Sequence, residues 1–595
     1  MSELKSRNDV SAEEKWKLEH LFENKEAWER EFAALSKEIP AMAEYKGRLK
    51  NYETVKEALF RQAELMQRAE RLFAYARMSR DTDNADEGYC AMTDKMMGLL
   101  VRANEILSYM QPELNLIANE TLLKWAENPE MAEFDYYLRE IERNKPHVLS
   151  DAEERLLALS GEISESYDTI YTMLSDVDMQ FEPVEKNGVK EAMSHGRYGL
   201  YLEDPDRNVR REAFESMYQA YRAQIHTVAA LYASSVKKDV FYARARHFTN
   251  TREAELFGGD IPVSVYDSLV EAIHSELPAL HRYVRLRAKT LKLPDLQMYD
   301  MYVPMTELPE TGVSFEKAKQ LVLKALVPLG KEYVETLEKA YESGWVDVRE
   351  TKGKTSGAYS WGVYGVHPYI LLNYQDRLDD AFTLAHESGH AMHSYLSNAA
   401  QPYSKASYRI FVAEVASTVN EVLMLHSLLN AAESEVMRKY LLELHLEQFR
   451  TTVFRQTMFA EFEQMTHERA EAGESLSKEW LCETYLSLNR SYYGEAVESG
   501  ELISYEWARI PHFYNAFYVY QYATGFCAAV AIADKLLKGE KGAVEGYLSF
   551  LSSGGSDSPI NVLKKAGVDL SKPDTVRQSL KVFSQTLSQL EGLLK

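Results

Sequence analysis

The chain has 595 residues, 45% of them hydrophobic and 27% charged, which is typical of a globular protein and too long for one ordinary core. The formal net charge of −23 argues against nucleic acid as a partner. Cys90, Cys482 and Cys527 form no paired pattern, and the sequence has neither a signal peptide nor a membrane-spanning apolar run. We therefore expect a cytoplasmic protein that does not contact membranes.

The first third of the chain predicts a succession of amphipathic helices. Apolar stripes with almost no Gly or Pro occur over residues 27–37, 54–80, 85–110 and 121–125. Ser150 and Glu153 form a capping box that predicts the start of another helix. This region carries no chemistry of its own, so we interpret it as support or cover for a site elsewhere. The alternative is a scaffold that binds a partner.

The helical pattern breaks near residue 180, where Asn187-Gly188 predicts a short hairpin with a two-residue turn. We place a domain boundary close to this point. It gives a helical N-terminal domain over residues 1–195 and a second domain over residues 196–595. The second domain begins with a long helix that we expect to start at Asp206.

Two strands are predicted in a Gly- and Tyr-rich stretch, over residues 345–348 and 368–374. They precede the next predicted helix directly, so we expect a small sheet beside that helix. Such a sheet could offer an edge strand to an extended peptide. A purely structural sheet is the alternative.

The helix predicted over residues 381–395 contains His386, Glu387 and His390 in the order H-E-x-x-H. Positions i and i+4 lie on one side of a helix, so the two imidazoles can hold one Zn²⁺ ion. Glu387 then lies beside the metal, where it can take a proton from metal-activated water. The helix is apolar over most of its circumference, and Gly389 within it indicates that another backbone comes close.

Two histidines do not complete a zinc site, so a third ligand is required. His393 lies on the same face, but ligands from one helix alone would be nearly collinear. A second apolar helix, predicted over residues 408–425, offers Glu414 and Glu421 on one face. A carboxylate buried among its valines must be paired or ligated. The pattern alone does not choose between the two glutamates.

The blocks GAYSWGVYGVHPYILLNYQDRLDDAFTLAHESGHAMHSYLS and FVAEVASTVNE resemble the oligoendopeptidase F group of the thimet-oligopeptidase-like family of zinc metallopeptidases. Similar blocks extend the resemblance over nearly the whole chain. The resemblance implies that His386, His390 and Glu414 bind one zinc ion and that Glu387 is the general base. It also implies two largely helical halves that enclose a deep channel. With the predicted elements, we expect a mainly α fold with a small β-sheet beside the zinc helix.

The segment ARIPHFYNAFYVYQYATG resembles the group that binds substrate and stabilises the oxyanion in this family. The resemblance implies catalytic roles for His512, Tyr514 and Tyr518, with Tyr518 as the first choice for the donor. Tyr514 and Tyr518 are one helical turn apart, and Tyr522 continues that face. An ordinary aromatic core is the alternative interpretation.

These observations predict a zinc-dependent endopeptidase that hydrolyses internal bonds of short oligopeptides, with Glu387 as general base for metal-activated water. One alternative is a non-catalytic, peptide-binding helical scaffold with a vestigial zinc site. The intact Glu387 argues against it, because that residue is not needed to bind metal. A carboxy- or dipeptidyl-peptidase of the same family is a second alternative, and it requires a charged anchor for a substrate terminus.

Overall fold

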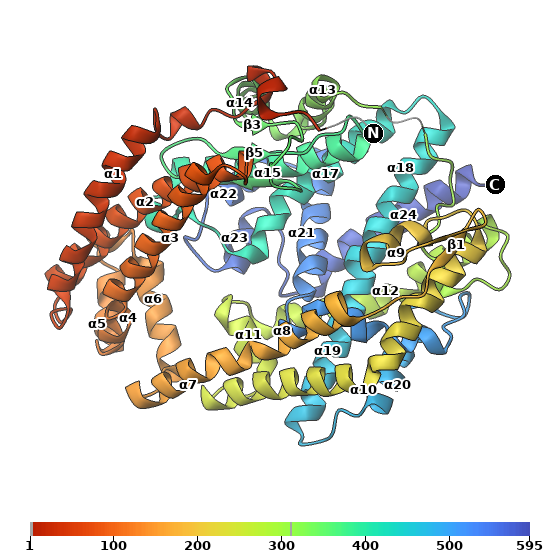
Figure 1. Ribbon diagram of the computed structural model, residues 1–595, viewed down its shortest axis with the longest axis horizontal. Coiled ribbons are helices and arrows are strands. Elements are labelled where there is room, and N and C mark those ends of the chain that lie inside the picture. Colours follow the sequence, from red (N-terminus) through yellow and green to blue (C-terminus); the bar gives the residue numbers. More distant parts are fainter. Residues whose placement is uncertain (1–3, 310–311) are drawn as a thin grey trace. The chain divides into compact units, whose positions relative to one another are not determined.

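The computed structural model describes residues 4–309 and 312–595, and over these residues the chain is mainly helical (Figure 1). Two small sheets, one of two and one of three strands, are the only sheets within the described residues. The expected mainly α fold is therefore confirmed. None of the described helices combines the length and the apolar character that crossing a membrane requires.

The chain forms two compact units, and each is assembled from three separate stretches of sequence. The first unit contains residues 4–146, 312–428 and 532–568, and the second contains residues 147–309, 429–531 and 569–595. The boundary expected at about residue 195 lies inside the second unit. That boundary stays a prediction, because it concerns a division along the sequence, whereas these units are defined by packing.

The first unit begins with helices whose apolar stripes meet in one core. Trp28, Leu35, Leu59, Leu72 and Met96 are among its members, and all are almost inaccessible to solvent. The helices are α1 Lys25–Glu38, α2 Tyr52–Thr82, α3 Glu87–Leu107, α4 Met110–Asn115, α5 Asn119–Ala126 and α6 Asp135–Asn144. The four helical segments predicted in this region correspond to α1, α2, α3 and α5.

The remainder of the first unit holds a sheet and the two helices of the predicted site. The elements are α13 Phe315–Ala325, α14 Lys331–Glu342, β3 Val346–Asp347, β4 Tyr359–Trp361, β5 Tyr369–Leu371, α15 Leu378–Ala400, α16 Tyr403–Ala406, α17 Ile410–Ala431, α22 Ala543–Leu551 and α23 Pro559–Lys565. The H-E-x-x-H motif lies on α15, and Glu414 lies on α17.

The sheet has the strand order β3-β5-β4. β3 pairs with β5 in parallel and β4 pairs with it antiparallel, so that Val346 and Ser360 both lie opposite Ile370. The strands predicted over residues 345–348 and 368–374 are confirmed as β3 and β5. β4 was not predicted, because three half-buried residues in a Gly-rich stretch show no alternation.

The sheet lies beside α15, as expected. A Cβ atom at Gly362, directly after β4, would collide with the side chain of Ser394 on α15. The contact between α15 and α17 is equally close, because a Cβ atom at Gly389 would lie 2.6 Å from the carbonyl oxygen of Ala416. The prediction that Gly389 allows another backbone to approach is therefore confirmed.

The second unit is built on long helices. Its elements are α7 Asp151–Ser164, α8 Ser166–Thr172, β1 Val184–Lys186, β2 Val189–Glu191, α9 His195–Leu202, α10 Arg207–Ala245, α11 Thr251–Gly258, α12 Val263–Thr290, α18 Glu435–Gln448, α19 Arg455–Glu471, α20 Lys478–Tyr493, most of α21 Tyr520–Leu537, and α24 Pro573–Leu593.

Local signals in the second unit are also confirmed. Ser150 and Glu153 form the predicted capping box at the start of α7, and Asp206 caps α10 through its side chain. β1 and β2 form a hairpin in which Lys186 lies opposite Val189. The turn between them is Asn187-Gly188, and both residues have positive φ, as a tight hairpin turn requires.

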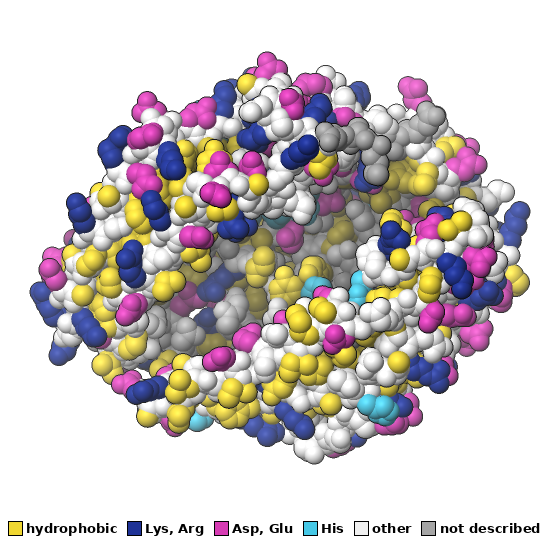
Figure 2. All heavy atoms as spheres, viewed as in Figure 1, with side chains coloured by type: hydrophobic (Ala, Val, Ile, Leu, Met, Phe, Trp, Pro, Cys, Tyr) yellow, Lys and Arg dark blue, Asp and Glu magenta, His cyan; other side chains and the backbone are white. Residues whose placement is uncertain are grey.

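The surface charge is dispersed on the face that Figure 2 shows, where acidic and basic side chains are interspersed. This pattern is typical of a solvated surface, so the net charge of −23 does not reflect one acidic patch on that face. The three cysteines are free thiols.

Candidate active site

Helix α15 brings two imidazoles together. The Nε2 atoms of His386 and His390 are 3.2 Å apart, and the two rings meet at an interplanar angle of 80°. Ala385 and Ala391 are fully buried on the other side of the helix and hold it in the core. Both imidazoles therefore present Nε2 to the same point, as the i, i+4 spacing predicts.

Glu414 on α17 faces the same point. Its Oε2 atom lies 3.4 Å from His386 Nε2 and 3.5 Å from His390 Nε2, and the three donor atoms lie within 4.8 Å of one another. Ser417, one turn further on, donates a hydrogen bond of 3.1 Å to the same carboxylate oxygen. The Glu414 side chain is 49% exposed, so the expected burial among valines is wrong: the carboxylate lies on the accessible side of α17.

Glu421 contacts the other nitrogen of the first histidine. His386 Nδ1 lies 2.6 Å from Glu421 Oε1, so Nδ1 donates its proton to the carboxylate, and a metal ion bound at Nε2 would take the place of the second ring proton. A carboxylate in this position orients a metal-binding imidazole and raises its basicity. The two glutamates on one face of α17 therefore approach the same ring from opposite sides.

Glu387 has a different environment from these carboxylates. It is 6% exposed, and its Oε2 atom has no hydrogen-bond partner among the described residues. Burial raises the pKa of the Glu387 carboxyl, and the neighbouring His386 and His390 offset part of that effect. An unpaired carboxyl oxygen directly after the first histidine in sequence makes Glu387 the candidate for proton transfer.

The donor set fits a divalent metal ion. Two imidazole nitrogens and one carboxylate oxygen are ligands that Zn²⁺ accepts in catalytic sites. The hydrogen bonds with His386 and His390 hold the pKa of Glu414 well below its usual range. Burial alone would lower the pKa of His386, but Glu414 and Glu421 outweigh it and raise that pKa to about 10. Both shifts indicate a site that stabilises positive charge.

His393 does not belong to this group. It is fully buried and stacks on Tyr408, with ring centroids 3.6 Å apart and an interplanar angle of 5°. Burial lowers its pKa to about 3, so the ring is neutral. His393 therefore packs the segment after α16 against α15.

The aromatic residues expected to bind substrate lie in the second unit. His512 Nε2 lies 3.2 Å from the Tyr522 hydroxyl, the rings of His512 and Tyr518 are stacked at 6.1 Å, and Tyr518 meets Tyr522 edge-on at 5.5 Å. Burial lowers the pKa of His512, which favours the neutral ring. These three side chains form one group, which we call the His512 cluster.

Tyr514 is separate from the His512 cluster. Its ring packs against Tyr171 at 4.6 Å, and its buried hydroxyl has no partner among the described residues. The expectation that Tyr514 and Tyr518 share a helical face is wrong. Tyr514 ends a 3₁₀ turn, and Phe517, at φ +52°, turns the chain before α21 begins at Tyr520.

A buried glutamate on α19 holds that turn, and nothing in the sequence points to it. The Phe517 N–H donates a 2.8 Å hydrogen bond to Glu463 Oε1. The Phe517 ring packs against His467 and Tyr266, with centroid distances of 4.7 and 5.8 Å. These contacts stabilise a left-handed backbone that a phenylalanine rarely adopts.

A mainly helical chain with an H-E-x-x-H helix, a carboxylate from the adjacent helix and a buried glutamate beside the first histidine has the features of a metallopeptidase. Residues 200–582 match the sequence model of peptidase family M3, and residues 113–181 match that of oligopeptidase F. The chain belongs to peptidase family M3, and it is a metallo-oligopeptidase.

Individual relatives agree with this assignment. The chain is 43% identical to oligopeptidase PepF of Bacillus subtilis, over 100% of this chain and 89% of the relative. It is 37% identical to group B oligopeptidase PepB of Streptococcus agalactiae, over 99% and 98% of the two chains. The solved structure of oligoendopeptidase-F from Enterococcus faecium is 35% identical and superposes with a TM-score of 0.72, over 95% of this chain and 98% of that one.

Proposed function

We propose that the protein is a zinc-dependent endopeptidase that hydrolyses internal bonds of short oligopeptides, acting in the cytoplasm. The observation that carries the proposal is the convergence of His386 Nε2, His390 Nε2 and Glu414 Oε2 within 4.8 Å, next to the buried Glu387 carboxyl. The relatives named above are described as oligopeptidases or oligoendopeptidases, which supports short peptides as the substrate class.

His386, His390 and Glu414 are the proposed ligands of one metal ion per chain. Three protein ligands leave further positions open, as catalytic zinc sites require. A zinc ion held there would polarise the scissile carbonyl and lower the pKa of a water molecule. Glu421 holds the His386 ring in the orientation that this requires.

Glu387 moves the proton in the proposed reaction. Its carboxylate takes a proton from the attacking water and passes it to the leaving amine. Burial raises the pKa of this carboxyl, so it holds a proton more readily than an exposed glutamate between the two transfers. No nucleophilic Ser or Cys is needed, because the water itself attacks the amide carbonyl.

The His512 cluster supplies the proposed donors for substrate and for the developing oxyanion. A neutral donor that strengthens its hydrogen bond as negative charge develops lowers the barrier. Tyr518 is the first candidate and His512 the second, because both belong to the cluster. Tyr514 is the weakest, since its hydroxyl lies in the buried interior of the second unit.

The proposal includes two features of the whole chain. One is the domain division at about residue 195, which is supported by the gap between the two family matches, residues 182–199. The other is a deep channel between two largely helical halves, which the family resemblance implies and which would restrict substrates to short, flexible chains.

Mass spectrometry of the products from a mixed peptide library tests the proposal. We expect cleavage at internal bonds and a loss of hydrolysis of about 10²–10⁴-fold in Glu387→Gln, with the zinc content unchanged. Release of only terminal residues or dipeptides would identify a carboxy- or dipeptidyl-peptidase. Peptide binding without any hydrolysis by the zinc-loaded protein would identify the non-catalytic scaffold.

A further inference from the structure

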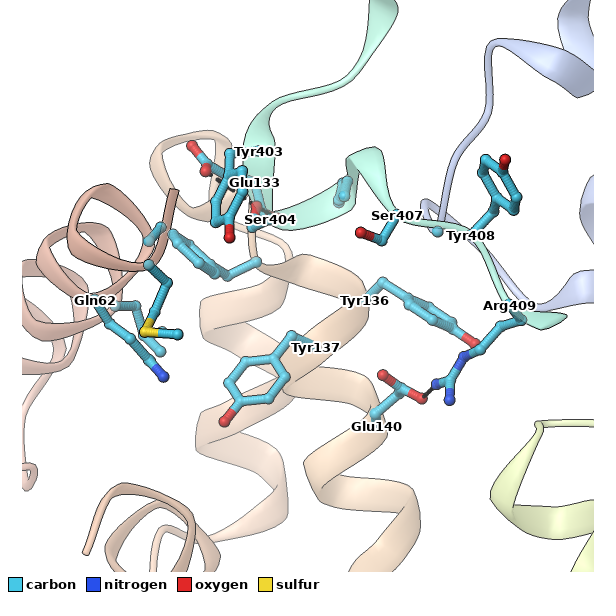
Figure 3. Close-up of a pocket in the computed structure, with 16 residues that line it drawn as sticks. Gln62, Glu133, Tyr136, Tyr137, Glu140, Tyr403, Ser404, Ser407, Tyr408 and Arg409 are labelled. Carbon is cyan, nitrogen blue, oxygen red and sulfur yellow. Dashed lines mark hydrogen bonds and ion pairs between the residues drawn. The ribbon is translucent and has the colours of Figure 1, made fainter. Parts of the chain in front are cut away.

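A pocket of about 390 Å³ lies in the first unit, outside the metal-binding group (Figure 3). Its walls come from α2, the region from residue 133 to residue 140 on and before α6, the segment 403–409, and Gly555. Leu59, Ala63 and Met66 of α2 provide aliphatic surface, and Tyr136 and Tyr137 of α6 provide aromatic surface. A volume of this size accommodates a large side chain.

Three of the four charged side chains that line this pocket, those of Glu140, Lys405 and Arg409, form ion pairs. Arg409 forms an ion pair with Glu140, drawn as the dashed line in Figure 3. Lys405 Nζ lies 2.6 Å from Asp135 Oδ1, and Ser404 Oγ donates a 3.0 Å hydrogen bond to Glu133. Glu133 keeps its negative charge, and aliphatic and aromatic side chains form the rest of the wall, so the pocket is suited to an apolar group and disfavours an anionic one.

The segment 403–409 joins this pocket to the metal-binding group. It connects α15, which carries the two histidines, to α17, which carries Glu414. Tyr408 in the pocket wall stacks on His393, and its hydroxyl lies 2.9 Å from Ser394 Oγ on α15. His393 follows His390 by three residues on α15, so this contact reaches the helix that carries the two proposed histidine ligands.

We propose that this pocket is a specificity subsite for an apolar or aromatic side chain of the peptide substrate, a few residues from the scissile bond. An extended peptide advances about 3.3 Å per residue, so a chain whose scissile bond lies at the metal-binding group would carry a side chain a few residues away along the segment 403–409. The subsite deepens the function proposed above and rests on it for the identity of the occupant.

Ala63→Phe tests the subsite, because the new ring occupies the space between α2 and α6. The measurement is the ratio of kcat/KM for two peptides that differ only in Phe or Ala at one position, scanned along the peptide. In the natural chain we expect a ratio of about 10–100 at one position, as burial of a large side chain predicts. In Ala63→Phe this ratio should fall to about 1–3.

Glu57→Phe is the matched control, because it adds the same ring to the exposed face of α2 outside the pocket. It should keep the natural ratio. Ser407→Phe narrows the pocket from the opposite wall, at an exposed position. It should lower the ratio of kcat/KM to the same extent, and it serves as the test if Ala63→Phe fails to fold. The subsite proposal is overturned if the natural chain shows no preference for Phe over Ala at any peptide position. It is also overturned if Ala63→Phe and Ser407→Phe keep the natural preference.

Calorimetry on Glu387→Gln separates this proposal from the proposed function. That variant should bind the Phe peptide more tightly than the Ala peptide, and the additional change Ala63→Phe should remove the difference. If the natural chain binds the Phe peptide more tightly than the Ala peptide but hydrolyses neither, the endopeptidase assignment is wrong and the subsite is retained. If the natural chain hydrolyses both peptides but binds them equally tightly, the subsite is wrong and the endopeptidase assignment is retained.

Discussion

Two carboxyl groups of the metal-binding region differ in the environment that sets their charge. Glu387 is buried, which raises its pKa, whereas hydrogen bonds to two imidazoles hold the pKa of Glu414 well below its usual range. Carboxyl groups whose pKa values are shifted in opposite directions perform different tasks. Glu414 keeps its negative charge over the ordinary pH range and suits a ligand, and Glu387 suits proton transfer.

The two glutamates of α17 should differ in their effect on metal content. Glu414→Ala removes a proposed ligand, so we expect the purified variant to lose its zinc. Glu421→Ala removes only the partner of His386 Nδ1 and should weaken zinc binding by about 10–100-fold. Metal analysis and competition with a chelator measure both effects. If Glu421→Ala loses the metal while Glu414→Ala retains it, the ligand assignment is wrong.

Tyr518 and Tyr514 form a natural pair for testing the oxyanion donor. Tyr518→Phe should lower kcat by about 10²–10³-fold and change KM little, since the lost hydrogen bond forms in the transition state. Tyr514→Phe should leave kcat nearly unchanged, because its buried hydroxyl has no partner to lose. Normal turnover in Tyr518→Phe would show that Tyr518 is not the oxyanion donor, and His512 would then be the remaining candidate in the His512 cluster.

The site could be predicted from the sequence only where local geometry is fixed. The spacing of His386 and His390 determines one shared face, and the structure confirms that face. Spacing places Glu414 and Glu421 on one face too, but it does not tell which imidazole nitrogen each one reaches. Family resemblance was needed to choose Glu414.

At the scale of elements, the contact between α15 and α17 depends on Gly389. In Gly389→Ala the new Cβ atom would lie 2.6 Å from backbone atoms of Ala416 and Ser417, which cannot move aside as a side chain can. We expect a loss of about 1–3 kcal/mol of unfolding free energy and weaker zinc binding, because the two helices must separate. Denaturant unfolding with and without zinc measures both.

Gly98→Ala on α3 is the matched control for that variant. Gly98 is also a helical glycine, but a Cβ atom there has nothing within 4 Å. The helix propensity of alanine should therefore stabilise the chain by up to about 1 kcal/mol. If both variants behave alike, the close approach at Gly389 is unimportant.

The carboxyl of Glu463 on α19 predicts a pH-dependent stability of the second unit. Burial raises its pKa from an ordinary value of 4.5 to about 8, with Asp239 on α10 and Glu255 on α11 acting in the same direction and His467 opposing them. The folded chain thus holds a proton that the unfolded chain releases. The resulting stability is complete below pH 4.5 and is lost as the pH rises towards 8.

Replacement of Glu463 by glutamine should remove this dependence. Glu463→Gln keeps an oxygen for the Phe517 N–H but does not ionise, so it should gain up to a few kcal/mol relative to the natural chain between pH 5 and pH 8. Denaturant unfolding at both pH values measures the difference. Glu468→Gln, at an exposed position of the same helix, is the control and should not shift the curve. Parallel pH curves for all three proteins would contradict the buried-carboxyl interpretation.

Most helices and the β1-β2 hairpin were predictable, because apolar periodicity, Ser150 with Glu153, and Asn187-Gly188 are local signals. The turn at Phe517 was not. Positive φ is usually marked by Gly or Asn, and here a phenylalanine adopts it because Glu463 and two rings distant in sequence hold it. Tertiary contacts of this kind leave no pattern in the segment that they reshape.

At the scale of the whole molecule, the proposed enclosure of the site predicts selection by substrate size. A short fluorogenic peptide should be hydrolysed, while the same cleavage sequence in an exposed loop of a stable protein should survive. The reason is that a folded protein cannot enter a deep channel. The measurement compares kcat/KM for the two substrates, with the unfolded form of the carrier protein as a control. Equal values for the peptide and the folded carrier would require an open cleft.

The composition of the first unit has a consequence for biosynthesis. Its core helices α1–α6 lie before residue 147, yet residues 532–568 are needed to complete it. At ribosomal speeds of about 5–20 residues per second, α15 waits on the order of 10 seconds or more for its packing partner α22. During that interval the nascent chain already contains His386, His390 and Glu414 but lacks α22 and α23 of their unit. The unit therefore reaches its final packing only near the end of translation, and the face of α15 that packs against α22 stays uncovered until then.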